Sequence, residues 1–182
     1  MDRRQKKTRE AIFKAFTELL SKKDFNNITV GEIIERADVG RATFYAHFET
    51  KDYLLKELCS ELFCHIFDAE HGEHNHKHIF DCDVTDSVFL HLFKHLQKND
   101  NQILQLLSGE NNGLFLYYFK TGLLDLVKNQ LDGFKKEKHN RLPNELLINH
   151  IASTFVETVK WWADNQCAQS PEIITEYFIS LI

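Results

Sequence analysis

Apolar residues recur at helical spacing, every third or fourth position, along most of this 182-residue chain. One such run begins at Lys7 and ends near Leu20, and the next begins at a capping-box pair, Thr29 with Glu32. Thr50 is a further N-cap, and a longer apolar stripe follows it. In the first part of the chain we therefore expect helices over about residues 7–20, 29–37, 41–48 and 50–70.

The same periodicity returns in the second part of the chain, beyond a polar segment at residues 71–78. Pro143 suits the first turn of a long helix, and Ser170 followed by Pro171 is a typical helix start. No segment alternates with the two-residue period of a strand, and only 2 Pro and 7 Gly are available for the turns of a β-sandwich. We therefore predict an all-α fold, with further helices over about residues 84–96, 103–107, 114–131, 143–165 and 171–182.

Charge divides the chain into two parts, although the whole chain has a net charge of -5. Residues 1–51 contain 11 Lys+Arg and 8 Asp+Glu, whereas residues 52–182 contain 11 and 19. Five of the first nine residues are basic. A basic head on an acidic body favours binding of a polyanion at the N-terminal end, and a solubilising terminal tail is the alternative interpretation.

Features that the sequence lacks exclude several classes of protein. No apolar run approaches the roughly 18 residues of a membrane span, and the basic N-terminus lacks the apolar stretch of a secretory signal. The 4 Cys show no Cys-x-x-Cys spacing, which is typical of reduced thiols in a cytoplasmic protein. No Gly-rich phosphate loop, nucleophile elbow or His-Glu-x-x-His motif occurs, and a di-iron bundle needs more than the single pair Glu73-x-x-His76. We therefore expect a cytoplasmic protein without a membrane partner, an enzymatic activity or a cofactor.

The two short helices expected near residues 29–37 and 41–48 are joined by only three residues, Asp38 to Gly40, which is typical of a helix-turn-helix. In that motif the first helix braces the second, and the second presents side chains to the base edges in the major groove of DNA. Arg41 can bind guanine through two hydrogen bonds, and Thr43 can hydrogen-bond a base or touch a thymine methyl group. Since a small helical bundle can produce the same pattern, the pattern alone leaves both interpretations open.

The DNA-binding signature of the TetR family of transcriptional regulators is similar to residues 28–55, above all to the motif Thr43-Phe44-Tyr45-x-x-Phe48-x-x-Lys51-x-x-Leu54. The resemblance implies an N-terminal three-helix helix-turn-helix domain, residues 1–51, followed by a helical effector-binding and dimerisation domain, residues 52–182. It also implies a homodimeric repressor that leaves a pseudo-palindromic operator in double-stranded DNA when a small effector binds. The exposed positions implied to face DNA are Thr29, Arg41, Ala42, Thr43, Tyr45, His47 and Lys51.

The resemblance gives these positions different roles. Thr29 and Lys51 match phosphate-contacting positions, whereas Arg41 and Thr43 match base-facing ones. Tyr45 and His47 match positions that touch phosphate or base edges. Gly40 departs from the family, which commonly has Ser as the N-cap of the recognition helix, and Gly is a cap weaker by only a few tenths of a kcal/mol.

In this family the body binds the effector and dimerises through its last two helices. Residues 144–165 are apolar over more than one stripe, which favours a second partner in addition to the chain's own core, although a wide single core is the alternative. The positions that we expect at a dimer interface are Phe155, Val159, Trp162, Ile174 and Phe178. Phe-rich segments of three helices predict a site for a small organic effector, at Phe63, Phe67, Phe89, His91, Phe93, His95, Phe115 and Phe119.

Histidine is enriched at two places in the body. Four His fall within residues 71–78, and His91 and His95 are one helical turn apart. Both arrangements can ligate zinc or copper, but we favour the alternative interpretation, a solvated loop for the cluster and a polar pocket or core edge for the pair. We assign no metal site and keep a metal-responsive regulator of the same family as the alternative. A helical adaptor that binds a membrane or a protein instead of DNA is a further alternative.

Overall fold

The computed structural model describes residues 3–70, 87–98, 104, 113–131 and 141–182. Over these residues the chain forms helices and no strand, which confirms the predicted all-α fold class. None of the described helices combines the length and apolar character that a membrane span requires. The helices are α1 (Arg3–Leu20), the 3-10 helix η1 (Phe25–Asn27), α2 (Val30–Ala37), α3 (Arg41–His47), α4 (Lys51–Glu70), α5 (Val88–Lys98), α7 (Gly113–Asn129), α9 (Asn144–Asp164) and α10 (Pro171–Leu181).

Helix starts in the structure follow the capping residues of the sequence. The Thr50 hydroxyl accepts a hydrogen bond of 2.9 Å from the backbone N–H of Tyr53 at the start of α4. Ser170 caps α10 and Pro171 occupies its first turn, as predicted. The first helix is longer than its apolar pattern indicates, because it continues back through the basic residues to Arg3. The expected helical segment at residues 103–107 lies outside the described residues except for Leu104.

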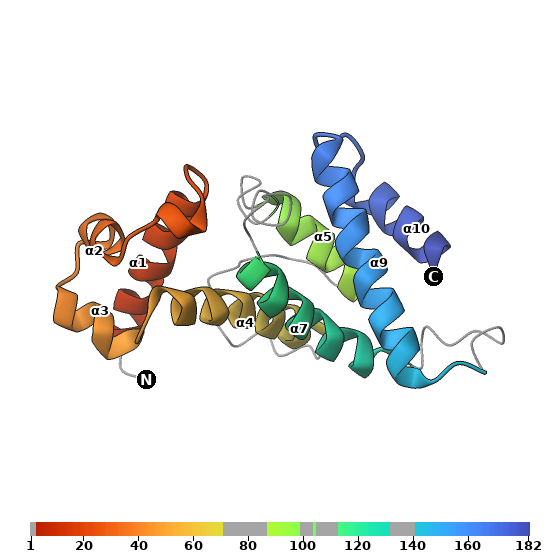
Figure 1. The fold of residues 1–182 in the computed structure, drawn as a ribbon, viewed down its shortest axis with the longest axis horizontal. Helices are drawn as coiled ribbons and strands as arrows, with labels where there is room; N and C mark the ends of the chain where they lie inside the picture. Colours follow the sequence, from red (N-terminus) through yellow and green to blue (C-terminus); the bar gives the residue numbers. More distant parts are fainter. Residues whose placement is uncertain (1–2, 71–86, 99–103, 105–112, 132–140) are drawn as a thin grey trace.

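The first three helices form a compact head with an aromatic interior. α1 packs on α2, and α2 contacts α3. Phe13 of α1 meets Phe48 edge to face, with ring centroids 5.3 Å apart, and Phe44 of α3 lies beside the same ring. In Figure 1 this head stands at one end of the molecule, and α4 leads from it into the remaining helices.

The body is built from α4, α5, α7, α9 and α10. α4 packs against α7 and α5, α7 packs against α9, and α10 covers α5 and α9. Its core is also aromatic. The ring centroid of Phe93 lies 4.7 Å from that of Phe155 and 5.7 Å from that of Trp162. α4 contributes to this core and also follows α3 directly (Figure 1). The position and direction of α4 therefore determine how the head is placed on the body.

Arg9 forms a polar contact between the head and α4. Its Nη2 atom donates to Glu57 Oε2 at 2.7 Å and to Glu61 Oε1 at 3.2 Å, one turn further along α4. The guanidinium also lies over the rings of Phe13 and Phe48, 4.9 and 5.1 Å from their centroids. Because these groups are partly buried, salt screens their contacts less than those of an exposed ion pair, and the contacts join α1 to α4 at Glu57 and Glu61.

Candidate nucleic-acid interface

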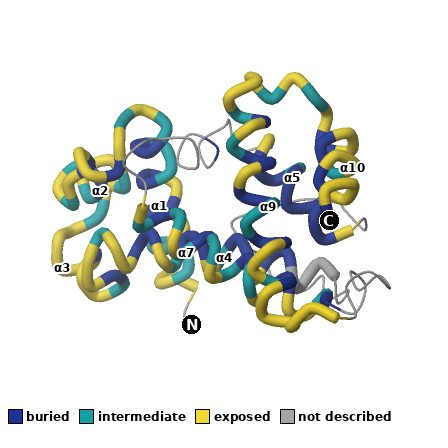
Figure 2. The backbone as a smooth tube through the Cα atoms, turned by 45° about the vertical axis from the view of Figure 1, so that its right-hand side comes forward, coloured by how far each residue is buried: buried dark blue, intermediate teal, exposed yellow. Residues whose placement is uncertain are grey.

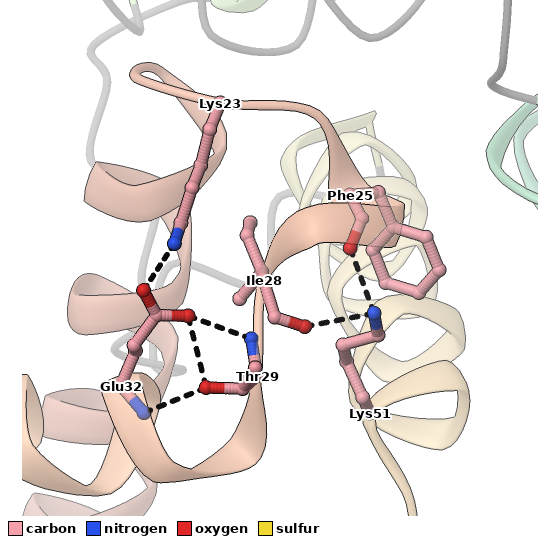
Figure 3. Close-up of polar contacts among 6 residues, drawn as sticks. All are labelled: Lys23, Phe25, Ile28, Thr29, Glu32 and Lys51. Atoms are coloured by element: carbon pink, nitrogen blue, oxygen red, sulfur yellow. Dashed lines mark hydrogen bonds and ion pairs between the residues drawn. The ribbon is translucent and has the colours of Figure 1, made fainter.

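The start of α2 is fixed by the capping box that the sequence predicts. The Thr29 hydroxyl accepts the backbone N–H of Glu32 at 3.2 Å, and the Glu32 carboxylate accepts the backbone N–H of Thr29 at 2.8 Å (Figure 3). The hydrogen bond from Lys23, followed by those from the Thr29 backbone and hydroxyl, lowers the pKa of Glu32 to about 2. A carboxylate that stays ionised thus ties the turn after α1, at Lys23, to the start of α2.

The turn between α2 and α3 is tight and leaves α3 without a side-chain cap. Asp38 ends α2 in the left-handed region, with φ 52°, and its backbone N–H bonds back to the α2 carbonyls. Gly40 is the N-cap of α3, as predicted, in an extended conformation that any residue can adopt. A Cβ at Gly40 would lie 3.6 Å from the Thr43 hydroxyl, an ordinary contact, so the backbone itself does not require glycine there.

Helix α3 is strongly divided between a buried and an exposed face. Phe44, with Phe48 directly after the helix, is fully buried against the head, which agrees with their expected packing role. The residues on the other face are exposed in Figure 2, with His47 half-buried at its edge. The exposed residues are the predicted Arg41, Ala42, Thr43 and Tyr45, together with Ala46. The structure therefore gathers these predicted positions on one outward face, where they can reach another molecule; the specific DNA contacts stay a prediction.

Lys51, which the resemblance implies is a phosphate contact, binds the protein's own backbone. Its ammonium group donates to the carbonyl of Phe25 at 2.7 Å and to that of Ile28 at 2.9 Å (Figure 3). The nitrogen also lies 4.2 Å from the centroid of the Phe25 ring, and burial lowers the pKa of Lys51. Lys51 thus braces η1 against α4, and one of its three N–H donors remains for a phosphate.

The predicted effector positions are brought together, but as packed core. The rings of Phe63 and Phe119 are 5.3 Å apart, and Phe119 and Phe115 are 5.7 Å apart. Phe89 and Phe93 are buried against Phe155. The close approach of α4 to α7 depends on Gly122, because a Cβ there would lie 2.3 Å from the Phe63 ring. The side chain of Phe67 and the His-rich segment 71–78 lie outside what the structure describes.

A third histidine joins the predicted pair in the body. His91 and His95 are buried on α5, and His65 of α4 lies against both rings. Sequence reasoning placed His65 beside the His-rich segment 71–78 and did not group it with His91 and His95, because it lies 26 residues before His91 and only the packing of α4 on α5 brings the two together. The one signal in the sequence was that His65 falls on the face of the predicted fourth helix that we expected to be buried.

The structure corrects the choice of dimerisation positions. Phe155, Val159, Trp162, Ile174 and Phe178 are all 0% exposed within a single chain, so they are core residues of the body. The error arises because apolar periodicity identifies the stripes of a helix but not which stripe faces the chain's own core.

The opposite face of α9 and α10 carries large exposed apolar side chains. Trp161, Tyr177 and Leu181 are 46%, 47% and 62% exposed, and the Trp161 and Tyr177 rings lie 6.3 Å apart. Together with the neighbouring Thr154 and Glu157 they line a groove of about 570 Å³. This surface has the apolar character of an interface rather than of a solvated helix face.

Two family models together match most of the chain. Residues 12–58 match the model of bacterial regulatory proteins of the tetR family, and residues 83–182 match the model of a transcriptional regulator C-terminal region. A TetR transcriptional regulator from Streptococcus agalactiae 2603V has a crystal structure that is 33% identical, with a TM-score of 0.73 over 99% of this chain and 96% of that one. The regulator FadR from Bacillus subtilis, crystallised with stearoyl-CoA, shares the fold at 17% identity, with a TM-score of 0.62 over 94% of this chain and 95% of that one.

Two curated relatives from Bacillus subtilis (strain 168) are described as uncharacterized HTH-type transcriptional regulators. YxbF is 39% identical over 71 residues, which are 36% of this chain and 19% of the relative. YvdT is 27% identical over 90 residues, 47% of this chain and 46% of the relative. The chain thus matches less than half the length of either of these two proteins.

Proposed function

Because the chain belongs to the TetR family, whose members are DNA-binding transcriptional regulators and not enzymes, we propose that it is a homodimeric repressor of a pseudo-palindromic operator. Residues 1–51 form the DNA-binding head in this proposal, and residues 52–182 form the body that dimerises and binds an effector. The observation that carries the proposal is the outward face of α3, where exposed Arg41 and Thr43 stand opposite the buried Phe44.

In the proposed complex, α3 lies in the major groove, and each of its exposed residues has a role that its chemistry supports. Arg41 and Thr43 read base edges near the N-terminus of the helix, where recognition helices make their base contacts. Tyr45 and His47 contact phosphate or base edges. Thr29 and the third N–H of Lys51 contact the phosphate backbone beside the groove, which fixes the register of the head but carries no sequence information.

A single head reads too few base pairs to select one site, so the proposal requires two chains. The exposed face of α9 and α10 supports a twofold interface, in which the same apolar surface of each chain covers the other. The two α3 helices of such a dimer would enter major grooves about one helical turn, roughly 34–36 Å, or a multiple of it apart.

For release from DNA, we propose a small organic effector bound among the aromatic rings of the body. The rings of Phe63, Phe89, Phe93 and Phe119 come from α4, α5 and α7 and support an apolar ligand. A ligand that enters by displacing ring contacts would move α4, and α4 carries the head. The ligand would then prefer one position of α4 over the other. Its effect on operator affinity is limited by the difference between its affinities for these two positions of α4.

The stoichiometry of the protein–DNA complex tests this function. Light scattering of the purified chain at micromolar concentration should give the mass of a dimer, and a duplex with both half-sites should bind two chains. A monomer that binds one isolated half-site as tightly as the full operator would overturn the proposal.

A further inference from the structure

Three buried imidazoles meet where α4 packs against α5. His65 lies on α4, and His91 and His95 lie one turn apart on α5. The three side chains are 7%, 2% and 2% exposed, and apart from Thr158 the other buried residues that the structure describes are apolar. The cluster therefore places three potential metal ligands at one point in an otherwise apolar interior.

Two of the three distances within the cluster are close to those between the ligands of a tetrahedral metal ion. Nε2 of His95 lies 2.9 Å from Nε2 of His65 and 3.1 Å from Nε2 of His91. All three ligand atoms lie within 4.8 Å of one another. Zinc–nitrogen bonds of about 2.0–2.1 Å put tetrahedral ligand atoms about 3.3 Å apart. Only small side-chain adjustments would therefore bring the three nitrogens to coordination distance.

Hydrogen bonds among the rings do not explain this arrangement by themselves. An imidazole nitrogen has one in-plane position, which holds either a proton or a lone pair. Nε2 of His95 has a ring nitrogen at hydrogen-bond distance on two sides, so its one position must be shared, either as donor to both or as acceptor from both, and a shared hydrogen bond is weaker than a direct one. A cation between the three nitrogens accepts one lone pair from each ring, so coordination satisfies all of them together.

We propose that His65, His91 and His95 form a three-histidine site for a divalent transition-metal ion, with zinc as the expected occupant, and that this ion changes operator affinity by joining α4 to α5. Neutral imidazole is a ligand for zinc and copper, whereas magnesium and calcium require oxygen ligands. Three protein ligands leave a fourth position for water or another exchangeable ligand. The metal site stands independently, but its effect on DNA rests on the proposed function.

The connection from this site to the head runs along α4. Glu57 and Glu61 of α4, eight and four residues before His65, hold Arg9 of α1. A metal ion that binds His65 together with two residues of α5 fixes this part of α4 on the body. Because Glu57 and Glu61 also join α4 to the head, the ion selects one placement of the head relative to the body.

The test uses the full chain, freed of metal with a chelator and then dialysed. Titration with Zn²⁺ against a coloured competing chelator should show a site that is lost in His95→Gln, which removes the central ligand but preserves side-chain volume. The loss of zinc affinity should exceed the roughly 10–100-fold that removal of an outer-shell partner costs. Co²⁺ gives a second readout, because a four-coordinate ion absorbs strongly in visible light. Mg²⁺ should not compete.

Two control variants separate this site from other histidines. His150→Gln changes an exposed histidine on α9 and should bind zinc like the unmodified chain. His74→Ala/His76→Ala changes the His-rich segment and should also retain the site. Circular dichroism of each variant shows whether it is folded. If His95→Gln does not fold, His65→Asn provides a second test of the same cluster.

Operator affinity with and without zinc completes the test. We expect zinc to change it at least fivefold in the unmodified chain and in both controls, but not in His95→Gln or His65→Asn. Zinc binding that survives in folded His95→Gln and His65→Asn overturns the site. Zinc binding without any change in operator affinity overturns its regulatory role. If the chain binds no DNA with or without zinc, the result contradicts the proposed function. The zinc titration alone then decides whether the three histidines form a metal site.

Discussion

Nε2 of His65 on α4 lies 2.9 Å from Nε2 of His95 on α5. Eight residues earlier on the same helix, Glu57 accepts a hydrogen bond of 2.7 Å from Arg9 of α1. The head therefore contacts α4 at Glu57, and the body contacts it at His65, about two turns further along. A ligand that alters the packing of α4 on α5 changes the position of the head, which provides a direct physical route from the body to DNA.

Replacement of Lys51 by Met should weaken the head and its DNA binding together. The change keeps the side-chain stem on Phe25 but removes the hydrogen bonds to the carbonyls of Phe25 and Ile28. We expect a loss of about 1–3 kcal/mol in the free energy of unfolding by urea. Operator affinity should fall for all sequences, and the slope of log K against log salt should decrease by about 1, because one phosphate contact is lost.

Lys56→Met is the matched control for Lys51→Met, since Lys56 is an exposed lysine on the same helix. Its unfolding free energy should stay within about 0.5 kcal/mol of the unmodified value. If Lys51→Met lowers stability but leaves the salt slope unchanged, then Lys51 only braces the head and does not contact phosphate.

The capping box should make the stability of the head depend on acid. The pKa of Glu32 is about 2 in the folded chain, below its ordinary value of 4.5, so its contribution is complete above pH 4.5 and is lost as the pH falls toward 2. Glu32→Gln can still cap the helix but lacks the charge that binds Lys23. The difference in melting temperature between the two proteins should therefore be larger at pH 6 than at pH 3.

A neighbouring glutamate on α2 supplies the control for this pH effect. Glu35→Gln, at an exposed position, should produce a smaller difference that does not follow the same pH range. Thr29→Ala removes the cap itself and should cost about 0.5–2 kcal/mol at neutral pH. Equal pH dependence of Glu32→Gln and the unmodified chain would show that the ion pair adds nothing to stability.

A charge in the exposed apolar face of α9 and α10 should prevent dimerisation. Tyr177→Asp places a carboxylate beside Trp161 and Leu181, where a partner surface would have to bury it without a counter-charge. The variant should be monomeric by light scattering and should lose tight binding to the full operator. Tyr117→Asp changes a tyrosine of α7 that is 65% exposed and should stay dimeric. Loss of the dimer in both variants would mean that the effect is not specific to this face.

Arg41→Ala and Thr43→Ala should each relax base preference at one position in each half-site. Removal of a base-reading side chain should cost roughly 1–3 kcal/mol of discrimination at that position. Binding measured on operators with single base-pair changes gives the preference at each position. An unchanged preference profile for Arg41→Ala would remove it from the base-reading set, although the family membership would stand.

Local signals in the sequence determine more of the head than of the body. Thr29 and Glu32 are three residues apart and fix the start of α2 wherever the rest of the chain lies, so the capping box could be predicted. The outward face of α3 follows from Phe44 and Phe48, which must be buried. Lys51 shows the limit of this reasoning, because its two carbonyl partners, Phe25 in η1 and Ile28 directly after it, lie more than twenty residues earlier in the chain.

In the body, the decisive contacts are between residues far apart in sequence. Trp162 and Trp161 are adjacent in an apolar run, but the first is fully buried and the second is 46% exposed. Each of the two Trp lies on an apolar stripe of the helix, and helical spacing supports burial of either stripe. The sequence could therefore not show which stripe packs in the core and which remains for a partner. His65 joins His91 and His95 only through the packing of α4 on α5, which no spacing along the chain encodes.

Selection of bound sequences from random duplex DNA, with the purified full chain, tests the central claim most directly. If two α3 helices of a dimer read DNA through Arg41 and Thr43, the selected sequences should converge on one pseudo-palindrome. The centres of its half-sites should be separated by about one helical turn or a multiple of it. Recovery of no common sequence, or of a motif without twofold symmetry, would contradict the account.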